Sequence, residues 1–222
     1  MKDRPSRRAI ALVAVSTVLL AILGWSVRAD SKDLQSLDGH RWWFDSRVVQ
    51  YRFKHRIWFD FEPRLRLLRI EEVLNFSVLA ALCVLLGVVL LGRRRPRAAA
   101  LYFAAVASGI VASLILKPLF GRSIQDATGG SVYTFPSGHT ALLSGTVVAW
   151  VLHSRTTKVA LAKSGLGAIV VGLYATLLSL TGSHFVTDCI GGALTSIAVV
   201  VGVHVASFVA FRPAPKPESP SN

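Results

Sequence analysis

Six long apolar blocks limit what this chain can fold into. Five of them carry no Asp, Glu, Lys or Arg and cover residues 9–27, 73–92, 98–116, 164–183 and 189–211, and a shorter sixth covers about 137–154. A helix of about 20 apolar residues crosses the roughly 30 Å hydrocarbon core of a bilayer. In lipid, every backbone polar group needs a partner within its own segment, which a helix provides. We therefore predict an all-α integral membrane protein with six transmembrane helices.

The distribution of charge predicts how these helices are oriented. The chain is 52% hydrophobic and 17% charged, with a net charge of +13. Many of the basic residues lie at the ends of the apolar blocks, where they act as topology signals and contact lipid headgroups, so we expect no nucleic-acid partner. If both termini are cytoplasmic, the inner segments 1–8, 93–97, 155–163 and 212–222 hold 13 Lys and Arg. This excess predicts a multi-pass protein of the cell membrane in that orientation.

The segments between and after the blocks also have distinct compositions. Residues 28–72 interleave aromatic and basic side chains, such as Trp42, Trp43 and Arg52, which is typical of an amphipathic segment lying on a membrane surface. This outer interfacial loop could be a simple anchor, or a lid that admits a lipid and contacts its headgroup. We predict a single membrane domain over residues 1–211, with its first apolar block retained as a helix. The proline-rich tail 212–222 is predicted to be disordered.

Three short stretches with reactive or charged side chains fall at the ends of apolar blocks. They are Lys117–Arg122, Pro136–His139 and His184–Asp188. The six-helix topology puts all three on the outer face of the membrane. Ionisable residues this close to a membrane span are costly and tend to be functional. We therefore expect the three stretches to form one site on the outer face.

His184 and Asp188 are candidates for catalysis. They are four residues apart, so on a helix they would share a face. A carboxylate that accepts a hydrogen bond from one imidazole nitrogen fixes the tautomer and makes the other nitrogen a better nucleophile. The alternative is a polar pair that caps the last helix.

Pro136–His139 and the two basic residues are candidates for binding and acting on an anion. A helix N-terminus offers unpaired N–H groups to an anion, and Gly138 lets that anion approach the backbone. His139 could protonate a leaving oxygen. Lys117 and Arg122 flank a turn on the same face, and as a pair they are suited to hold phosphate oxygens. Alternatively, either could extend to the lipid interface.

The order of these motifs resembles the type 2 phosphatidic acid phosphatase superfamily, which includes the lipid phosphate phosphatases. The resemblance covers about residues 98–211. It implies that His184 attacks phosphorus and forms a phosphohistidine, that Asp188 orients His184, and that His139 is the general acid. It also implies that the enzyme needs no metal and no other cofactor.

The resemblance further implies that Lys117, Ser137 and Gly138 bind phosphate. The chain departs from the family pattern at two arginine positions, which hold Ile124 and Leu178. A phosphate monoester carries nearly two negative charges at neutral pH, so a further cation should stabilise the transition state. We expect Arg122 to supply it. Possible helpers from the outer loop are Arg64, Arg66 and Arg69.

Together these features predict a membrane phosphatase that hydrolyses a lipid phosphate. Candidate substrates are polyprenyl phosphate or diphosphate, phosphatidylglycerophosphate and phosphatidate. Two other functions remain open at this point. A non-catalytic protein that binds or transports a lipid phosphate would explain the missing arginines. A vanadate-dependent peroxidase is disfavoured by the six spans. The sequence makes no prediction of oligomeric state.

Overall fold

The computed structural model describes residues 7–28, 45, 70, 74, 76–125, 131–154, 156–181 and 183–210, and these ranges contain six α-helices. The helices are α1 Arg7–Arg28, α4 Phe76–Gly92, α5 Pro96–Phe120, α6 Gly138–Leu152, α7 Thr157–Thr181 and α8 Val186–Ala210. Each apolar block corresponds to one helix, so the predicted six-helix fold is confirmed. Most of the predicted interfacial loop, and the whole tail 212–222, lie outside the described residues.

The helices differ in length. Among those described, α1, α5, α7 and α8 are long and apolar enough to cross a membrane, with 22 to 25 residues each. Helices α4 and α6 are also apolar but have 17 and 15 residues.

Local capping defines the helix ends that lie near the predicted site. The Ser137 hydroxyl accepts the N–H of Thr140 at the start of α6. Gly121 closes α5 with a positive φ of 67°, and its N–H donates to the carbonyl of Lys117.

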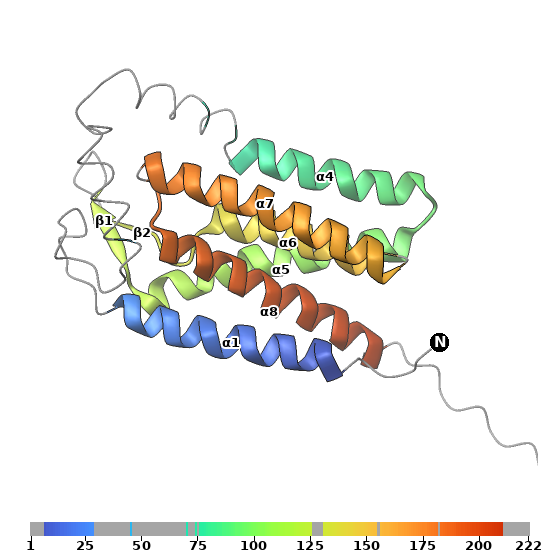
Figure 1. Cartoon of the computed structure of the whole chain (residues 1–222), viewed down its shortest axis with the longest axis horizontal. Helices are drawn as coiled ribbons and strands as arrows, with labels where there is room; N and C mark the ends of the chain where they lie inside the picture. The colour runs from blue at the N-terminus through green and yellow to red at the C-terminus, as the bar shows by residue number, and fades with distance from the viewer. Residues whose placement is uncertain are drawn as a thin grey trace, which may run out of the picture.

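Helix α8 packs against α1, α5 and α6, while α7 packs on α6 and α4 on α5 (Figure 1). Two short strands, β1 Ser123–Gln125 and β2 Ser131–Tyr133, form an antiparallel hairpin in which Ser123 lies opposite Tyr133. Within the described residues, this hairpin is the departure from an all-helical chain. It lies at the end of the bundle where α5 ends and α6 and α8 begin. We call this the hairpin end.

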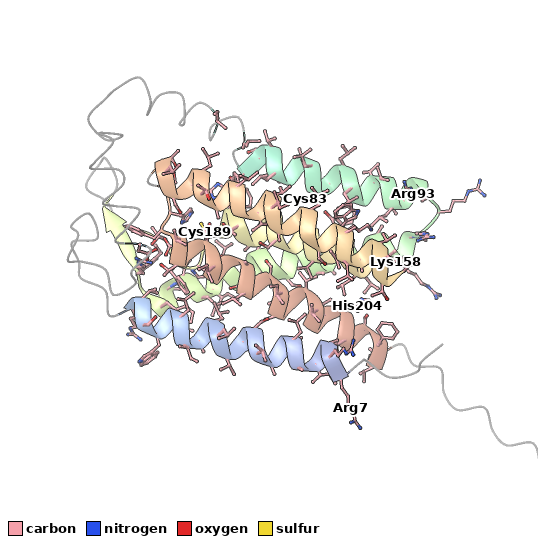
Figure 2. The ribbon with its side chains drawn as sticks, in the orientation of Figure 1. Arg7, Cys83, Arg93, Lys158, Cys189 and His204 are labelled. Carbon is pink, nitrogen blue, oxygen red and sulfur yellow. The ribbon has the colours of Figure 1, made fainter. Side chains whose placement is uncertain are left out.

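The opposite end of the bundle carries basic side chains. Figure 2 shows Arg7, Arg93 and Lys158 there, where α1 begins and α8 ends. This arrangement agrees with the clustering of cations at alternate block ends in the sequence. The orientation of the bundle in a cell membrane remains a prediction.

Gly192 controls how closely α8 approaches the start of α6. A Cβ atom at Gly192 would lie 2.4 Å from the Ser137 carbonyl oxygen and 3.1 Å from the Ala141 nitrogen. One turn later, the Ser196 hydroxyl donates to the Ala141 carbonyl. Small residues of this kind let two helices pack with their backbones in contact. The contact joins the two helix starts that carry the predicted site.

We expect Gly192→Ala to lower the unfolding temperature, because the added methyl group meets backbone atoms that cannot move aside. Overpacking of this kind typically costs about 1–3 kcal/mol. The measurement is thermal unfolding of the purified protein in detergent. Gly202→Ala on the same helix is the control, since no atom lies within 4 Å of its added Cβ. Equal unfolding temperatures for the two variants would contradict this close approach.

Candidate active site

Two histidines from different helix ends meet at the hairpin end. His139 lies in the first turn of α6, and His184 lies two residues before the start of α8. Their ring centroids are 5.8 Å apart, with an angle of 65° between the ring planes. The His139 ring also makes an edge contact with Phe76 of α4 at 5.6 Å. The two imidazoles are therefore close enough to contact the same bound group.

Asp188 lies behind His184 in the first turn of α8. Its Oδ2 atom is 3.7 Å from His184 Nδ1, which is too long for a hydrogen bond, and it accepts the N–H of Phe185 at 2.9 Å. Within the described residues, His184 Nδ1 is buried and has no hydrogen-bond partner. Contrary to expectation, the pair does not share a helix face. Helix α8 begins at Val186, and the His184 N–H donates to the carbonyl of Leu178. Distances of this size at catalytic sites often shorten when a ligand binds.

Arg122 has a different environment from the one expected for a phosphate ligand. Its side chain is buried, and its Nη1 atom donates to Asp188 Oδ1 at 3.0 Å while Nη2 donates to Asp45 Oδ2 at 3.1 Å. The guanidinium carbon lies 4.5 Å from the ring centroid of Phe185. These contacts direct the guanidinium to two protein carboxylates. The arrangement favours a role in holding Asp188 over direct phosphate binding.

Asp45 is a residue of this site that sequence analysis missed. Its side chain is 0% exposed, and its Oδ1 atom accepts the Thr187 N–H at 3.1 Å. Its Oδ2 atom accepts the Thr187 hydroxyl at 2.6 Å as well as Arg122. The Thr187 N–H belongs to the unpaired first turn of α8, so Asp45 caps this helix from 142 positions away in the sequence. Residues 28–72 contain eight acidic side chains, and no local pattern distinguishes Asp45 among them.

The predicted phosphate ligands differ in accessibility. Lys117 is half-buried in the last turn of α5, within range of an electrostatic interaction with Asp188. Gly138 and His139 are partly exposed at the start of α6. Ser137 is fully buried, its hydroxyl caps α6, and its N–H donates to the Asp188 carbonyl at 2.9 Å. Its side chain therefore supports the junction of α6 and α8, whereas Lys117, Gly138 and His139 are partly accessible to an anion.

Neither of the two altered arginine positions supplies a cation. Leu178 is fully buried and belongs to the same apolar cluster as Tyr102 and Leu142. Ile124 lies in β1, where it pairs with Val132. Among the other proposed sources of charge, the outer-loop arginines lie outside the described residues.

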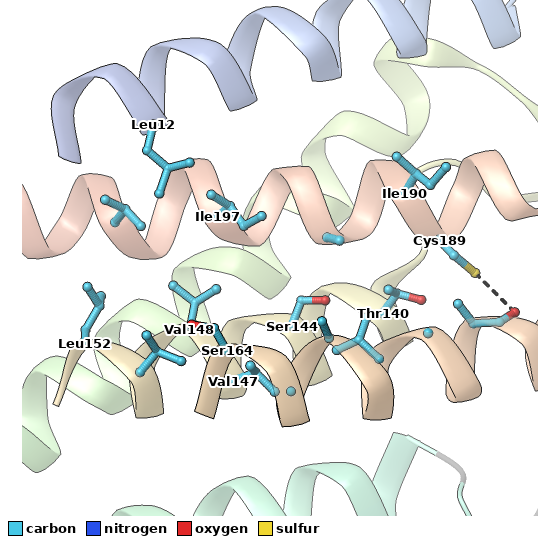
Figure 3. Close-up of a pocket in the computed structure, with 18 of the residues that line it drawn as sticks. Leu12, Thr140, Ser144, Val147, Val148, Leu152, Ser164, Cys189, Ile190 and Ile197 are labelled. Carbon is cyan, nitrogen blue, oxygen red and sulfur yellow. Dashed lines mark hydrogen bonds between the residues drawn. The ribbon is translucent and has the colours of Figure 1, made fainter. Parts of the chain in front are cut away.

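An apolar cavity of about 520 Å³ lies beside the site, between α6, α7 and α8, with Leu12 of α1 at its far end (Figure 3). It extends along α6 from Thr140, the neighbour of His139, to Leu152. At 1.5 Å per residue, this distance is about 18 Å. Most of its wall is hydrocarbon, including Val147 and Ile197. The volume lies within the range of ligand pockets.

The bundle has a PAP2-like fold. It is similar to the crystal structure of the first transmembrane PAP2-type phosphatidylglycerolphosphate phosphatase from Bacillus subtilis, with a TM-score of 0.61 and 18% sequence identity. The match covers 89% of this chain and 96% of that one. Comparison with protein families finds no match, and comparison with curated proteins finds none either. At this level of identity, the likeness concerns the fold.

Proposed function

We propose that this chain is a membrane phosphatase that hydrolyses a lipid phosphate. The observation that carries the proposal is the pairing of His139 with His184. Their ring centroids are 5.8 Å apart, and Asp188 lies behind His184. Lys117 lies at the same end of the bundle. A nucleophile with an orienting carboxylate, an acid and a cation can together hydrolyse a phosphate ester through a covalent intermediate. The PAP2-like fold supports this assignment.

The first half of the reaction transfers the phosphoryl group to His184. Its Nε2 atom, the ring nitrogen remote from Asp188, attacks phosphorus while Lys117 and the N–H groups at the start of α6 hold the phosphate oxygens. The bond between phosphorus and the lipid oxygen breaks, and protonated His139 gives its proton to that oxygen. Asp188 stabilises the positive charge that the His184 ring acquires.

The second half of the reaction releases inorganic phosphate. Neutral His139 takes a proton from a water molecule, whose oxygen attacks the phosphohistidine. The phosphorus–nitrogen bond then breaks, and the electron pair returns to His184. Both histidines regain their starting protonation states, so each cycle consumes one lipid phosphate and one water molecule and releases the lipid alcohol and inorganic phosphate.

The apolar cavity favours a lipid over a soluble phosphate ester. The end of the cavity nearest the site is formed by Thr140 and Cys189, which are the immediate sequence neighbours of His139 and Asp188. A hydrocarbon chain in this cavity would leave its phosphate at the hairpin end, beside the histidines. Suitable lipids are polyprenyl phosphate or diphosphate, phosphatidylglycerophosphate and phosphatidate. The similar crystal structure is, by its name, that of a phosphatidylglycerolphosphate phosphatase, so this lipid is the first one to test.

Phosphate release by the purified protein in lipid nanodiscs tests this function. The panel contains the four lipid classes and glycerol phosphate as a soluble control, each assayed with and without a chelator. We expect at least one lipid to release phosphate at the same rate in both conditions. The absence of release from every lipid would refute the phosphatase function. Activity that a chelator abolishes and Mg²⁺ restores would refute the metal-independent mechanism.

One observation favours a second function, the binding or transport of a lipid phosphate without hydrolysis. Leu178 is buried where the family pattern has an arginine, and Arg122 is held by Asp45 and Asp188. Fewer cations are then available to stabilise the transition state. Saturable binding of a lipid from the same panel, without phosphate release, would identify this function.

We expect Gly172→Leu to weaken the use of long-chain lipids. Gly172 lines the cavity, and no atom lies within 4 Å of an added Cβ, so the leucine side chain would occupy space in it. Displacing two methylenes of a bound chain, at about 0.8 kcal/mol each, raises KM by roughly tenfold. A short-chain analogue should be unaffected.

Gly165→Leu on the same helix is the matched control. An added Cβ at Gly165 also meets no atom within 4 Å, but this residue is not part of the cavity wall. KM values for long and short chains are measured for both variants. The same ratio of the two KM values in Gly172→Leu as in the wild type would show that the cavity does not hold the lipid chain.

A further inference from the structure

The three buried charges behind His184 form a connected group. Arg122 bridges Asp188 and Asp45 through its two terminal nitrogens, and all three side chains are at most 1% exposed. Thr187 completes the group, since its hydroxyl lies between Arg122 and Asp45 and its N–H donates to Asp45. The mechanism above uses Asp188 and leaves the function of Asp45 open.

The formal charges of the group indicate what Asp45 does. Two carboxylates share one guanidinium, so the group carries one net negative charge on the Nδ1 side of His184. Without Asp45, Arg122 would neutralise Asp188 completely. In a buried site of low dielectric, such a charge acts strongly on its neighbours. The His184 ring becomes positive when its Nε2 atom binds phosphorus, and a net negative group at Nδ1 stabilises that positive charge.

The geometry indicates a second effect of Asp45. Its Oδ1 atom caps α8 at Thr187, the residue that immediately precedes Asp188. Asp188 is held in turn by the Phe185 N–H and by Arg122. The capping contact therefore fixes the helical turn that carries the orienting carboxylate.

We propose that Asp45 is a positioning residue for the hydrolytic reaction. It acts through Arg122 and Thr187 to hold Asp188 against His184 and to keep the group behind His184 negatively charged. This inference rests on the proposed phosphatase function. It extends the active site to the segment between α1 and α4, which carries none of the three motifs.

The test compares Asp45→Asn with Asp45→Ala. Asparagine keeps the shape and an oxygen that can accept the Thr187 N–H, but it removes the charge. We expect Asp45→Asn to lower kcat by about tenfold or more, in line with the loss of other residues that orient a reacting group. KM should stay within roughly twofold, because the contacts of Asp45 are to Arg122 and Thr187, which do not hold the phosphate in the proposed mechanism. Asp45→Ala should in addition lower the unfolding temperature.

A double-mutant cycle separates positioning from general structural support. If Asp45 acts through Asp188, then Asp45→Asn should cause little further loss of kcat in an Asp188→Asn background. An equal factor in both backgrounds would overturn the proposal, as would unchanged kcat in the single variant. If Asp45→Asn folds poorly, Thr187→Val provides the same test, since it removes the hydroxyl that contacts both Asp45 and Arg122. Unchanged kcat in a folded Thr187→Val protein would then overturn it.

A spectroscopic measurement keeps this test separate from the proposed function. Nitrogen-15 NMR of labelled histidine reports the tautomer and protonation of His184, assigned by comparison with His184→Gln. We expect Asp45→Asn and Thr187→Val to lower the fraction of His184 that is protonated at Nδ1. An unchanged His184 signal would refute the inference even in an active enzyme. A changed signal in a protein without phosphatase activity would support the positioning role and refute the phosphatase function.

Discussion

The variant His184→Ala is expected to fold normally and to release no measurable phosphate from any lipid. The imidazole is the group positioned to bond to phosphorus, with Asp188 on its Nδ1 side and His139 beside it. Removing a catalytic nucleophile typically lowers kcat on the order of 10⁴-fold or more. The fold should persist because the backbone N–H of residue 184 can still donate to the Leu178 carbonyl.

The measurement is phosphate release, together with thermal unfolding as a check of folding. His204→Ala is the control, because His204 lies in α8 about 27 Å along the helix from its start at Val186, and its ring contacts Phe208. This control should retain the wild-type rate. A folded His184→Ala protein with a near-normal rate would exclude a phosphohistidine at this position.

The second large effect is expected for His139→Ala. As the proposed general acid, His139 protonates the oxygen that leaves with the lipid, a contribution of about 10² to 10⁴ in rate. The loss should depend on the leaving group, because an acid helps a basic alkoxide most. We expect the full loss for an alkyl lipid phosphate and a much smaller one for p-nitrophenyl phosphate, whose leaving group needs little protonation.

The rates for both substrates are measured in the wild type, His139→Ala and a control, His153→Ala. His153 lies at the other end of α6, where its Nδ1 atom contacts the Ala149 carbonyl. The control should keep the wild-type ratio of the two rates. Equal losses for both substrates in His139→Ala would argue that this residue binds phosphate and does not act as an acid.

Much of the fold follows from local properties of the chain. Uncharged blocks of about 20 residues have few alternatives to a membrane helix, because each backbone group must find its partner within the segment. The capping of α6 at Ser137 and the end of α5 at Gly121 are also local, because each capping contact joins residues three or four positions apart. Helix α5 nevertheless continues through Pro118 to Phe120, where the sequence predicted a turn. These ends, together with the order of the helices, bring Lys117, His139 and His184 to the same end of the bundle.

The contacts within the site depend on residues far apart in the chain. Arg122 meets Asp188 and Asp45, which lie 66 and 77 positions away, and no periodicity in the sequence encodes either contact. The expected phosphate ligand is therefore found between two carboxylates. His184 lies before α8 because Val186 starts that helix, which a four-residue spacing could not reveal. Helices form from hydropathy and hydrogen bonding within a segment, whereas the partners of a buried charge are set by the packing of segments distant in sequence.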